Sequence, residues 1–486
     1  MTSNNASQFA AHSRENRTTA VLREWLSHFP GALPVLYLVG GAVRDLMLCQ
    51  TAKDIDLVCR GAKRFARKLA AAKNAAVVAM EKKANEPCYR VVDRSCTDNF
   101  IDVAELRGET IEEDLGRRDF TINAMAIEVG EEGGLGESID PFHGMDDLEK
   151  RSIRVTSAEA FVSDPLRILR AVRFAAKLNF EIEAATLSHM ARLAYLVPQV
   201  SFERITSELL VILETPTSCS FFQLLDRLGV LEALFPEIQA MKGCTQNSHH
   251  HRDVWQHSLM VMENCETIID HPAQWLGALS KPVMENLCHD RRLPLLKLAA
   301  LLHDAGKPAA RQVNPESGRI TFYGHDGKGS RIADEVGQRL KLSNRDRTFL
   351  SSLVAEHPHV LALSAPEVRP ATRMRWFRRM KDDAVPAIIL SMADIEGTLG
   401  PDSTEESRSA HIEWCKSTVA DYYQVIKKRI EQQSLISGND LLALGMKAGP
   451  DMGRVLKNIE EARDAGEIHT RDDALKLARQ FVDAVS

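Results

Sequence analysis

The chain has 486 residues, of which 44% are hydrophobic and 26% charged, with a formal net charge of −6 at pH 7. This composition excludes a disordered or fibrous chain, and the acidic balance excludes nucleic-acid binding by the whole surface. Local basic patches would have to bind any nucleic acid. No apolar run reaches the roughly 20 residues that cross a membrane, and the polar first residues lack the apolar core of a signal peptide. Nine cysteines without a C-x-x-C pair indicate free thiols rather than disulfides or a zinc framework, so we predict a cytoplasmic protein without membrane contact.

In chain order, the sequence predicts five segments. Residues 1–34 are expected to form a helical extension, and residues 35–150 alternate short strands such as "LYLV", "DIDLVC" and "FIDVAEL" with helices. Amphipathic helices are expected over 151–240 and 241–400, and glycine-punctuated short helices over the tail at 401–486. A sheet domain followed by helical domains predicts the α+β fold class.

Two carboxylates, Asp54 and Asp56, lie one residue apart in "DIDLVC". In a strand they point to the same face, where a divalent cation would relieve their repulsion, and Mg²⁺ prefers such oxygen ligands together with substrate phosphates. Upstream, Gly40 and Gly41 follow an apolar strand and precede a helix that carries Arg44, so backbone N–H groups can approach a phosphate there. An isolated D-x-D is more often an exposed strand edge, but the glycine pair at this distance predicts a nucleoside triphosphate held over a metal.

A third carboxylate would complete a two-metal site for in-line phosphoryl transfer. We predict that Asp102 in "FIDVAEL" fills this place, because it is the acid of that segment with apolar neighbours on both sides. In the following "RRDFTINAMAI", Arg117 and Arg118 would neutralise phosphate charge, while Asp119 and Asn123 would fix the backbone or the sugar. Alone, such a run is usually a solvated helix start.

The ordered segments "GGAVRDLML", "KDIDLV", "RRDFTINAMAI", "DPFHGMDDLEKRSIRV" and "DPLRILRAVRFAAKLNF" closely resemble class II tRNA nucleotidyltransferases and bacterial poly(A) polymerases, within the polymerase-beta-like nucleotidyltransferases. The resemblance covers about the first 215 residues. It implies a polymerase-beta-like head domain at 35–150, with Mg²⁺ held by Asp54 and Asp56, and a helical nucleotide-selecting neck at 151–240.

Members of this family select the incoming base with side chains rather than with a template, and the matching segment here is "SDPLR". Asp164 and Arg167 lie three residues apart, on one helix face, and would imitate a complementary base edge. Arg170 and Arg173 continue the row as a basic stripe suited to phosphates. The alternative is that Asp164 caps the helix and Arg167 is a surface charge.

Two departures from the family pattern bear on nucleotide choice. Many members carry glutamate before the selecting aspartate, where this chain has Ser163. Members that add the full C-C-A carry a longer loop after the third carboxylate, whereas only "VAELRGETIEEDLG" separates Asp102 from Arg117 here. Because a shortened loop is associated with partial addition, an enzyme that adds only CC or only A stays an alternative.

A second constellation lies in residues 244–400 and consists of His257, His303, Asp304, His325, His357 and Asp394. One histidine on an apolar helix is usually a core residue, but sites in this order resemble HD-domain phosphohydrolases. The resemblance implies a divalent Mn, Ni, Co or Fe ion, or Mg²⁺, in a core site, with His325 and His357 available to a second metal. Lys307 would contact a phosphate, and His249–His251 either line the site or form an exposed turn.

The sequence therefore predicts a template-independent nucleotidyltransferase that adds or repairs all or part of the 3′-terminal C-C-A of tRNA from CTP and ATP. An HD phosphoesterase acting on RNA 3′ ends is expected in the same chain. The alternatives are a poly(A) polymerase and an HD phosphohydrolase whose head domain only binds RNA. The segment "RMRWFRRMKDD" is either an RNA contact or a packed helix face, and the tail either binds RNA or packs. No pattern predicts an oligomeric state.

Overall fold

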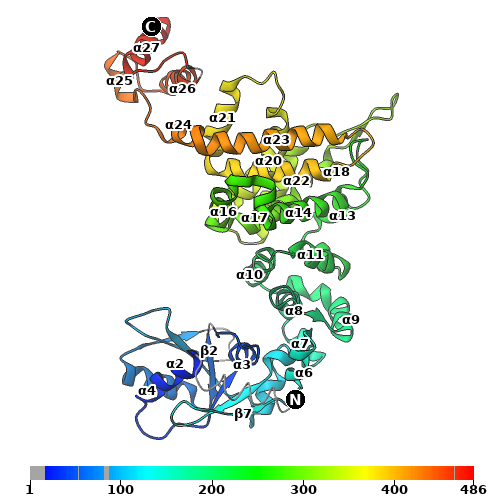
Figure 1. Cartoon of the computed structure of the whole chain (residues 1–486), viewed down its shortest axis with the longest axis vertical. Coiled ribbons are helices and arrows are strands. Elements are labelled where there is room, and N and C mark those ends of the chain that lie inside the picture. The colour runs from blue at the N-terminus through cyan, green and yellow to red at the C-terminus, as the bar shows by residue number, and fades with distance from the viewer. Residues whose placement is uncertain (1–16, 53, 81–86, 465, 486) are drawn as a thin grey trace. The chain divides into compact units, whose positions relative to one another are not determined.

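The computed structural model describes residues 17–52, 54–80, 87–464 and 466–485 (Figure 1). The chain forms two compact units. The first contains the residues up to 212 together with 225–234, and the second contains 213–224 together with the chain from 235 onward. The predicted class is confirmed, since a sheet domain comes first and helical domains follow.

A seven-stranded sheet with the strand order β3-β4-β5-β2-β1-β6-β7 forms the core of the first unit. Its strands are β1 (Leu36–Val39), β2 (Ile55–Cys59), β3 (Ala76–Met80), β4 (Cys88–Val92), β5 (Phe100–Glu105), β6 (Ala126–Val129) and β7 (Leu135–Ile139). Neighbouring strands pair antiparallel except β2 and β5, which are parallel. The predicted alternation is confirmed, because Leu38, Leu57 and Val103 of three neighbouring strands are fully buried.

The helices of the sheet domain are α2 (Arg17–Leu26), α3 (Gly41–Met47), α4 (Ala62–Lys73), α5 (Ile111–Gly116) and α6 (Gly144–Glu149). Helix α4 is bounded by two left-handed residues, Gly61 before it and Asn74 after it. Its apolar stripe includes Phe65, Ala66 and Leu69, which are buried as the helix packs against β4 and β5.

The connection that follows the sheet contains β8 (Ser152–Ile153), β9 (Glu181–Ile182), α7 (Glu159–Ser163), α8 (Leu166–Leu178), α9 (Ala184–Leu193), α10 (Phe202–Leu213) and α12 (Val230–Leu234). Helix α8 begins directly after Pro165 and ends at Leu178, followed by the C-cap Asn179, whose backbone is left-handed. Ile168, Leu169 and Val172 of α8 are fully buried, so the arginines of this helix lie on its other side.

The second unit is built on the long helices α14 (Val254–Asp270), α17 (Arg292–Leu302), α19 (His325–Arg339), α20 (Asn344–Leu363), α22 (Ala384–Gly397) and α23 (Glu405–Asp421). Shorter elements are α11 (Ser218–Arg227), α13 (Glu237–Met241), α15 (Pro272–Leu276), α16 (Ser280–Cys288), α18 (Lys307–Ala310), β10 (Gln312–Val313), β11 (Ile320–Thr321), α21 (Pro370–Met380) and α24 (Lys427–Glu431). Helices α14 and α20 both pack against α17 and α22. Residues 384–393 of α22 are buried on every side of the helix, which explains their uninterrupted apolar sequence.

A buried ion pair joins three of these helices. The ammonium group of Lys297 on α17 donates to Glu266 of α14 at 3.1 Å and to the carbonyl of Thr215, just before α11, at 2.7 Å. Glu266 also accepts a hydrogen bond from the Ser218 hydroxyl. The charge on Lys297 is therefore compensated although its side chain is almost completely buried.

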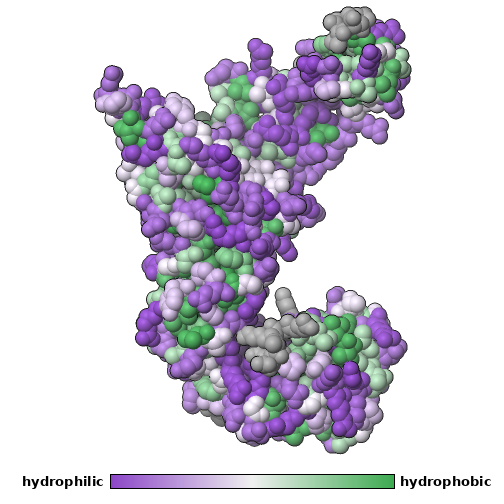
Figure 2. All heavy atoms as spheres, turned by 180° about the vertical axis from the view of Figure 1, so that it is seen from behind, coloured by the Kyte–Doolittle hydropathy of each residue, from purple (hydrophilic) through white to green (hydrophobic). Residues whose placement is uncertain are grey.

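The tail forms a small helical module of α25 (Gly438–Ala443), α26 (Pro450–Asp464) and α27 (Arg471–Val485), which bury their own cluster including Leu441, Ile459 and Ala474. Among the described residues, none of the helices is both long and apolar enough to span a membrane. Hydrophilic residues cover most of the face that Figure 2 presents.

Candidate functional site

The acidic residues of the sheet domain gather where β2 and β5 run side by side. Asp56 of β2 lies directly opposite Asp102 of β5 in the parallel register, so both side chains point to the same face. Neighbouring strands are about 4.8 Å apart, which places the two carboxylates side by side. Asp102 is buried, Asp56 is half-buried, and the exposed Asp54 lies just before β2. The structure thus brings Asp56 and Asp102 together as the sequence predicts.

Gly40 lies against this acidic group. Its φ is 68°, a left-handed value that favours glycine, and it forms the N-cap of α3. A Cβ atom on Gly40 would lie 3.0 Å from Nη1 of Arg118 and 4.0 Å from Oδ2 of Asp56. A Cβ on Gly41 would lie 3.5 Å from Nη2 of Arg44. The glycine pair therefore allows the backbone to approach the arginines and the carboxylates closely.

A buried carboxylate that the motif analysis did not single out, Asp114, holds two arginines beside these acids. It accepts from Nε of Arg118 at 3.1 Å and from Nε of Arg107 at 3.0 Å, and the backbone N–H of Arg107 also donates to it at 3.2 Å. Burial would raise the pKa of Asp114, but the charges of Arg118 and Arg107 hold it below its usual value. Asp56, Asp102, Arg107 and Arg118 line one cavity of about 190 Å³ with Asp114.

Asp119 and Asn123 lie in an internal network rather than on the open face. The buried Asp119 accepts from Arg170 of α8 at 2.9 and 2.5 Å and from the Asn123 amide at 3.1 Å. Arg44 donates to the Asn123 carbonyl oxygen at 2.8 Å. Burial would raise the pKa of Asp119, but the Arg170 charge lowers it below its ordinary value. These residues connect α3, the segment after Arg118 and α8.

The arginines of α8 have carboxylate or carbonyl partners. Arg173 pairs with Glu208 of α10, and Arg167 donates to the backbone carbonyl of Arg117 at 2.7 Å. Asp164, just before α8, accepts from Arg204 of α10 at 2.8 Å. The sequence predicts a basic stripe suited to phosphates at Arg170 and Arg173, and the folded chain places a carboxylate against each of these guanidinium groups. Arg167 is positioned by main-chain oxygens.

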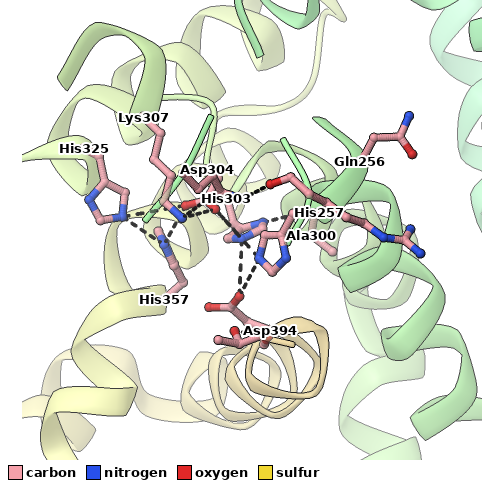
Figure 3. Close-up of polar contacts among 12 residues, drawn as sticks. Gln256, His257, Ala300, His303, Asp304, Lys307, His325, His357 and Asp394 are labelled. Atoms are coloured by element: carbon pink, nitrogen blue, oxygen red, sulfur yellow. Dashed lines mark hydrogen bonds and ion pairs between the residues drawn. The ribbon is translucent and has the colours of Figure 1, made fainter. Parts of the chain in front are cut away.

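The second constellation converges from five places in the helical unit (Figure 3). His257 comes from α14, His303 and Asp304 follow α17, His325 begins α19, His357 lies in α20 and Asp394 lies in α22. Oδ2 of Asp304 lies 3.2 Å from Nε2 of His303 and 3.9 Å from that of His257, whereas Oδ1 lies 3.5 Å from Nε2 of His357 and 3.8 Å from that of His325. Oδ1 of Asp394 lies 2.9 Å from Nε2 of His257. Asp304 therefore lies between two pairs of imidazoles.

Three of these histidines share one hydrogen-bond pattern. Nδ1 of His303, His325 and His357 lies 2.7–2.9 Å from the backbone carbonyl three residues earlier. Such a bond assigns the ring proton to Nδ1 and leaves Nε2 as a ligand. Nε2 of His325 and Nε2 of His357 then meet at 3.3 Å, with two lone pairs facing each other. A bound cation would relieve this repulsion, so the cluster fits a metal.

The ligand atoms of His257, His303 and Asp394 lie within 4.8 Å of one another, and so do those of His303, Asp304 and His357. Burial lowers the pKa of His257 and of His325, which favours the neutral imidazole that binds metals. Burial would raise the pKa of Asp304, but His303 and Lys307 hold it well below its ordinary value. The carboxylates and imidazoles of the cluster form a donor set for a divalent ion.

Three comparisons with known proteins agree with this arrangement. The family models for the "Poly A polymerase head domain", the "Probable RNA and SrmB- binding site of polymerase A" and the "HD domain" match residues 36–154, 179–242 and 254–396. The chain is 30% identical over 460 residues to the A-adding tRNA nucleotidyltransferase of Deinococcus radiodurans, covering 93% of this chain and 96% of that protein. The chain belongs to the tRNA nucleotidyltransferase family.

A second member of this family, the CC-adding tRNA nucleotidyltransferase of Thermus thermophilus, is 31% identical over 443 residues, which cover 90% of this chain and 91% of that protein. Among solved structures, the Thermotoga maritima CCA-adding enzyme complexed with tRNA aligns with a TM-score of 0.64 at 22% identity, over 99% of this chain and 98% of that chain. A CCA-adding enzyme in complex with ATP aligns with a TM-score of 0.65 at 24% identity, over 96% of this chain and 94% of that chain. These structures show that the fold of the family extends through the chain.

The residues around the histidine cluster differ in whether they contact it. The ring of His250 packs on His257 with centroids 4.5 Å apart, whereas His249 and His251 are exposed. Lys307 donates to Asp304 and to the side-chain oxygen of Gln246, at 2.6 and 2.7 Å. Lys307 thus already has partners within the cluster, and no spacing in the sequence pointed to Gln246.

The segment "RMRWFRRMKDD" is a packed helix face rather than an open basic patch. Trp376 and Phe377 are buried. Arg378 donates hydrogen bonds to both carboxylate oxygens of Asp464 in α26, each at 2.7 Å, and Arg375 pairs with Glu461 of the same helix. The basic residues of α21 therefore join the tail module to the helical unit, which favours the packing interpretation.

Proposed function

We propose that this chain adds all or part of the 3′-terminal C-C-A sequence to tRNA from CTP, ATP or both. The observation that carries the proposal is that Asp56 and Asp102 lie opposite each other on neighbouring strands, with Gly40 and Arg118 close by. The chain is also similar over most of its length to a tRNA nucleotidyltransferase. We propose Mg²⁺ as the ion held by Asp54, Asp56 and Asp102, where it would stabilise charge at the reacting phosphate.

The side chains divide the work of the reaction. The tRNA 3′-hydroxyl oxygen would attack the α-phosphorus and lose its proton to water; a new P–O bond forms as the bond between the α- and β-phosphates breaks, and pyrophosphate leaves. Arg118 and Arg107, held by Asp114, supply positive charge to the triphosphate in the same cavity as the acids. Arg117, on the exposed side, would add to this charge. Asp164 and Arg167 would read the base edge with geometry set by Arg204 and by the carbonyl of Arg117.

The short segment between Asp102 and Arg117 favours partial addition over complete C-C-A synthesis. Asp114 fixes the backbone and the side chain of Arg107, and Glu105 accepts from the backbone N–H groups of Gly61 and Ala62. A segment held in this way cannot rearrange freely to change base preference. We therefore propose that the chain adds one kind of nucleotide, C or A.

The test incubates purified protein and Mg²⁺ with tRNA transcripts that end before, within and one residue short of C-C-A, with CTP, ATP or both. Partial addition predicts a stop after CC, or addition of the final A alone. Extension by all three residues would contradict partial addition but would still support nucleotidyltransferase activity. A long A ladder would identify a poly(A) polymerase, and no extension by the wild type under any condition would refute the proposal.

We also propose that the histidine cluster is a phosphoesterase site that acts on phosphorylated RNA 3′ ends, such as 2′,3′-cyclic phosphates. Its support is the convergence of four imidazoles and two carboxylates from five helices or helix termini in one buried place. We propose a divalent Mn, Ni, Co or Fe ion, or Mg²⁺, for this site, which would activate water against a phosphate ester. An active cluster would let one chain clean an RNA end and then rebuild it.

The phosphoesterase test compares His303→Ala with His359→Ala. His359 is an exposed histidine two residues beyond His357 on the same helix and is therefore a matched control. Cyclic phosphate hydrolysis should fall by more than a hundredfold in His303→Ala and stay unchanged in His359→Ala, while nucleotide addition reports that both variants are folded. Equal hydrolysis by the two variants would refute the assignment.

A further inference from the structure

Three charged side chains form a row across the middle of the sheet. Asp56 of β2 is opposite Asp102 of β5, and Asp102 is opposite Arg90 of β4. Directly opposite residues on neighbouring strands point to the same face, so the row reads carboxylate, carboxylate, guanidinium. The family motifs account for the two acids but leave Arg90 without a function.

Arg90 is held in one orientation. Its Nε donates to Oδ1 of Asp102 and its Nη2 donates to Oδ2, both at 2.8 Å. The guanidinium carbon lies 3.8 Å from the centre of the Phe100 ring. The Asp102 carboxylate therefore holds the edge of the Arg90 guanidinium group, and the Phe100 ring holds its face. The Asp102 hydrogen bonds raise the pKa of Arg90, partly opposed by burial, and the Asp54 charge adds to the rise. The positive charge therefore stays beside all three acids.

We propose that Arg90 is a positioning residue of the nucleotidyl-transfer site, which holds the Asp102 carboxylate in one orientation beside Asp56 and weakens cation binding to the acids before substrate enters. The inference rests on the proposed function of the head domain for its kinetic half. A carboxylate oxygen has two lone pairs, so accepting one hydrogen bond from Arg90 does not by itself prevent it from facing a cation.

The two effects of Arg90 act in opposite directions, which separates this role from a purely structural one. Because the Arg90 charge lies beside the carboxylates, removing it should tighten metal binding by about tenfold at a water-like dielectric constant. Removing its two hydrogen bonds to Asp102 should let the Asp102 carboxylate rotate and should slow the chemical step. A residue that only stabilises the fold would weaken both metal binding and turnover.

The test uses full-length Arg90→Gln and Arg90→Lys, with Arg154→Gln as the matched control. Arg154 also places two nitrogens on a buried carboxylate of the same domain, that of Asp147, and its side chain is 33% exposed against 30% for Arg90. Mn²⁺ binding is measured by electron paramagnetic resonance without nucleotide. Binding by the Asp54→Asn, Asp56→Asn double variant gives the background from the histidine cluster.

Arg90→Gln should bind Mn²⁺ about tenfold more tightly while its kcat falls at least tenfold. Arg90→Lys should keep an affinity near that of the wild type but still lose turnover, because lysine has the charge without the fork. Arg154→Gln should change neither. Unchanged or weaker Mn²⁺ binding in Arg90→Gln, or an unchanged kcat, would overturn the inference. Absence of nucleotide addition by the wild type would instead refute the proposed function. The Mn²⁺ affinities would then still test the effect of Arg90 on cation binding.

Discussion

Replacing Asp114 by asparagine should weaken triphosphate binding by disturbing the two arginines that Asp114 holds. In the folded chain this carboxylate is 1% exposed and receives hydrogen bonds from the side chains of Arg107 and Arg118 and from the Arg107 backbone. Asparagine has nearly the same shape but no charge. It can accept with one oxygen only, so at least one guanidinium group loses its partner.

The expected magnitude follows from the bonds that are lost. A hydrogen bond to a charged group contributes about 1.5–3 kcal/mol, so losing one in the Arg107 and Arg118 pair should lower kcat/KM by roughly 10- to 150-fold. Because the arginines act on the triphosphate, KM for CTP or ATP should rise, while KM for tRNA should change little. Unfolding free energy should fall by about 3 kcal/mol, the cost of breaking a buried ion pair.

The assay is steady-state extension of a tRNA transcript over a range of nucleotide concentrations, alongside urea denaturation. Asp147→Asn is the control, because Asp147 is a buried carboxylate of the same domain that binds Arg154 and Thr121. It should lose similar stability and keep KM within about twofold. If Asp114→Asn and Asp147→Asn changed KM equally, the positioning role of Asp114 would be refuted.

Three further changes test other parts of the structure. Lys297→Met leaves Glu266 buried without its cation and should lower unfolding free energy by about 3–5 kcal/mol in denaturation, whereas adding Glu266→Gln should restore part of it. Burial lowers the pKa of His411 to about 4, so protonation of this residue favours the unfolded state. The unfolding free energy should therefore fall by about 2 kcal/mol from pH 7 to pH 5. In thermal melts across this range, His411→Gln should make the unfolding free energy depend less on pH. Arg204→Ala removes a half-exposed partner of Asp164 and should change the ratio of kcat/KM for CTP and ATP about fivefold, in competition assays; an unchanged ratio would contradict a positioning role.

The sequence predicted the order of sheet and helices, and it indicated candidate residues for both sites, because local signals carry this information. Alternation marked β2 and β5, and the spacing of Asp54 and Asp56 predicted both acids on one face of a strand, whereas in the structure Asp56 lies in β2 and Asp54 lies just before it. The order of His257, His303, Asp304 and Asp394 indicated a metal cluster, and the structure brings these residues together. Each of these predictions depended on spacing within a short segment or on a family resemblance.

What the tertiary structure decided were the partners of charged groups far apart in the chain. Arg170 and Arg173 look like a phosphate-binding stripe in sequence, but Asp119 and Glu208 neutralise them across the fold. Arg90 faces Asp102 only because β4 and β5 pair in one register, and a shift by one residue would turn the guanidinium to the other face. The residue types and their local spacing thus determined which chemistry is available. The strand register and the helix packing determined which of those charges are paired, because pairing depends on distances that the linear sequence does not contain.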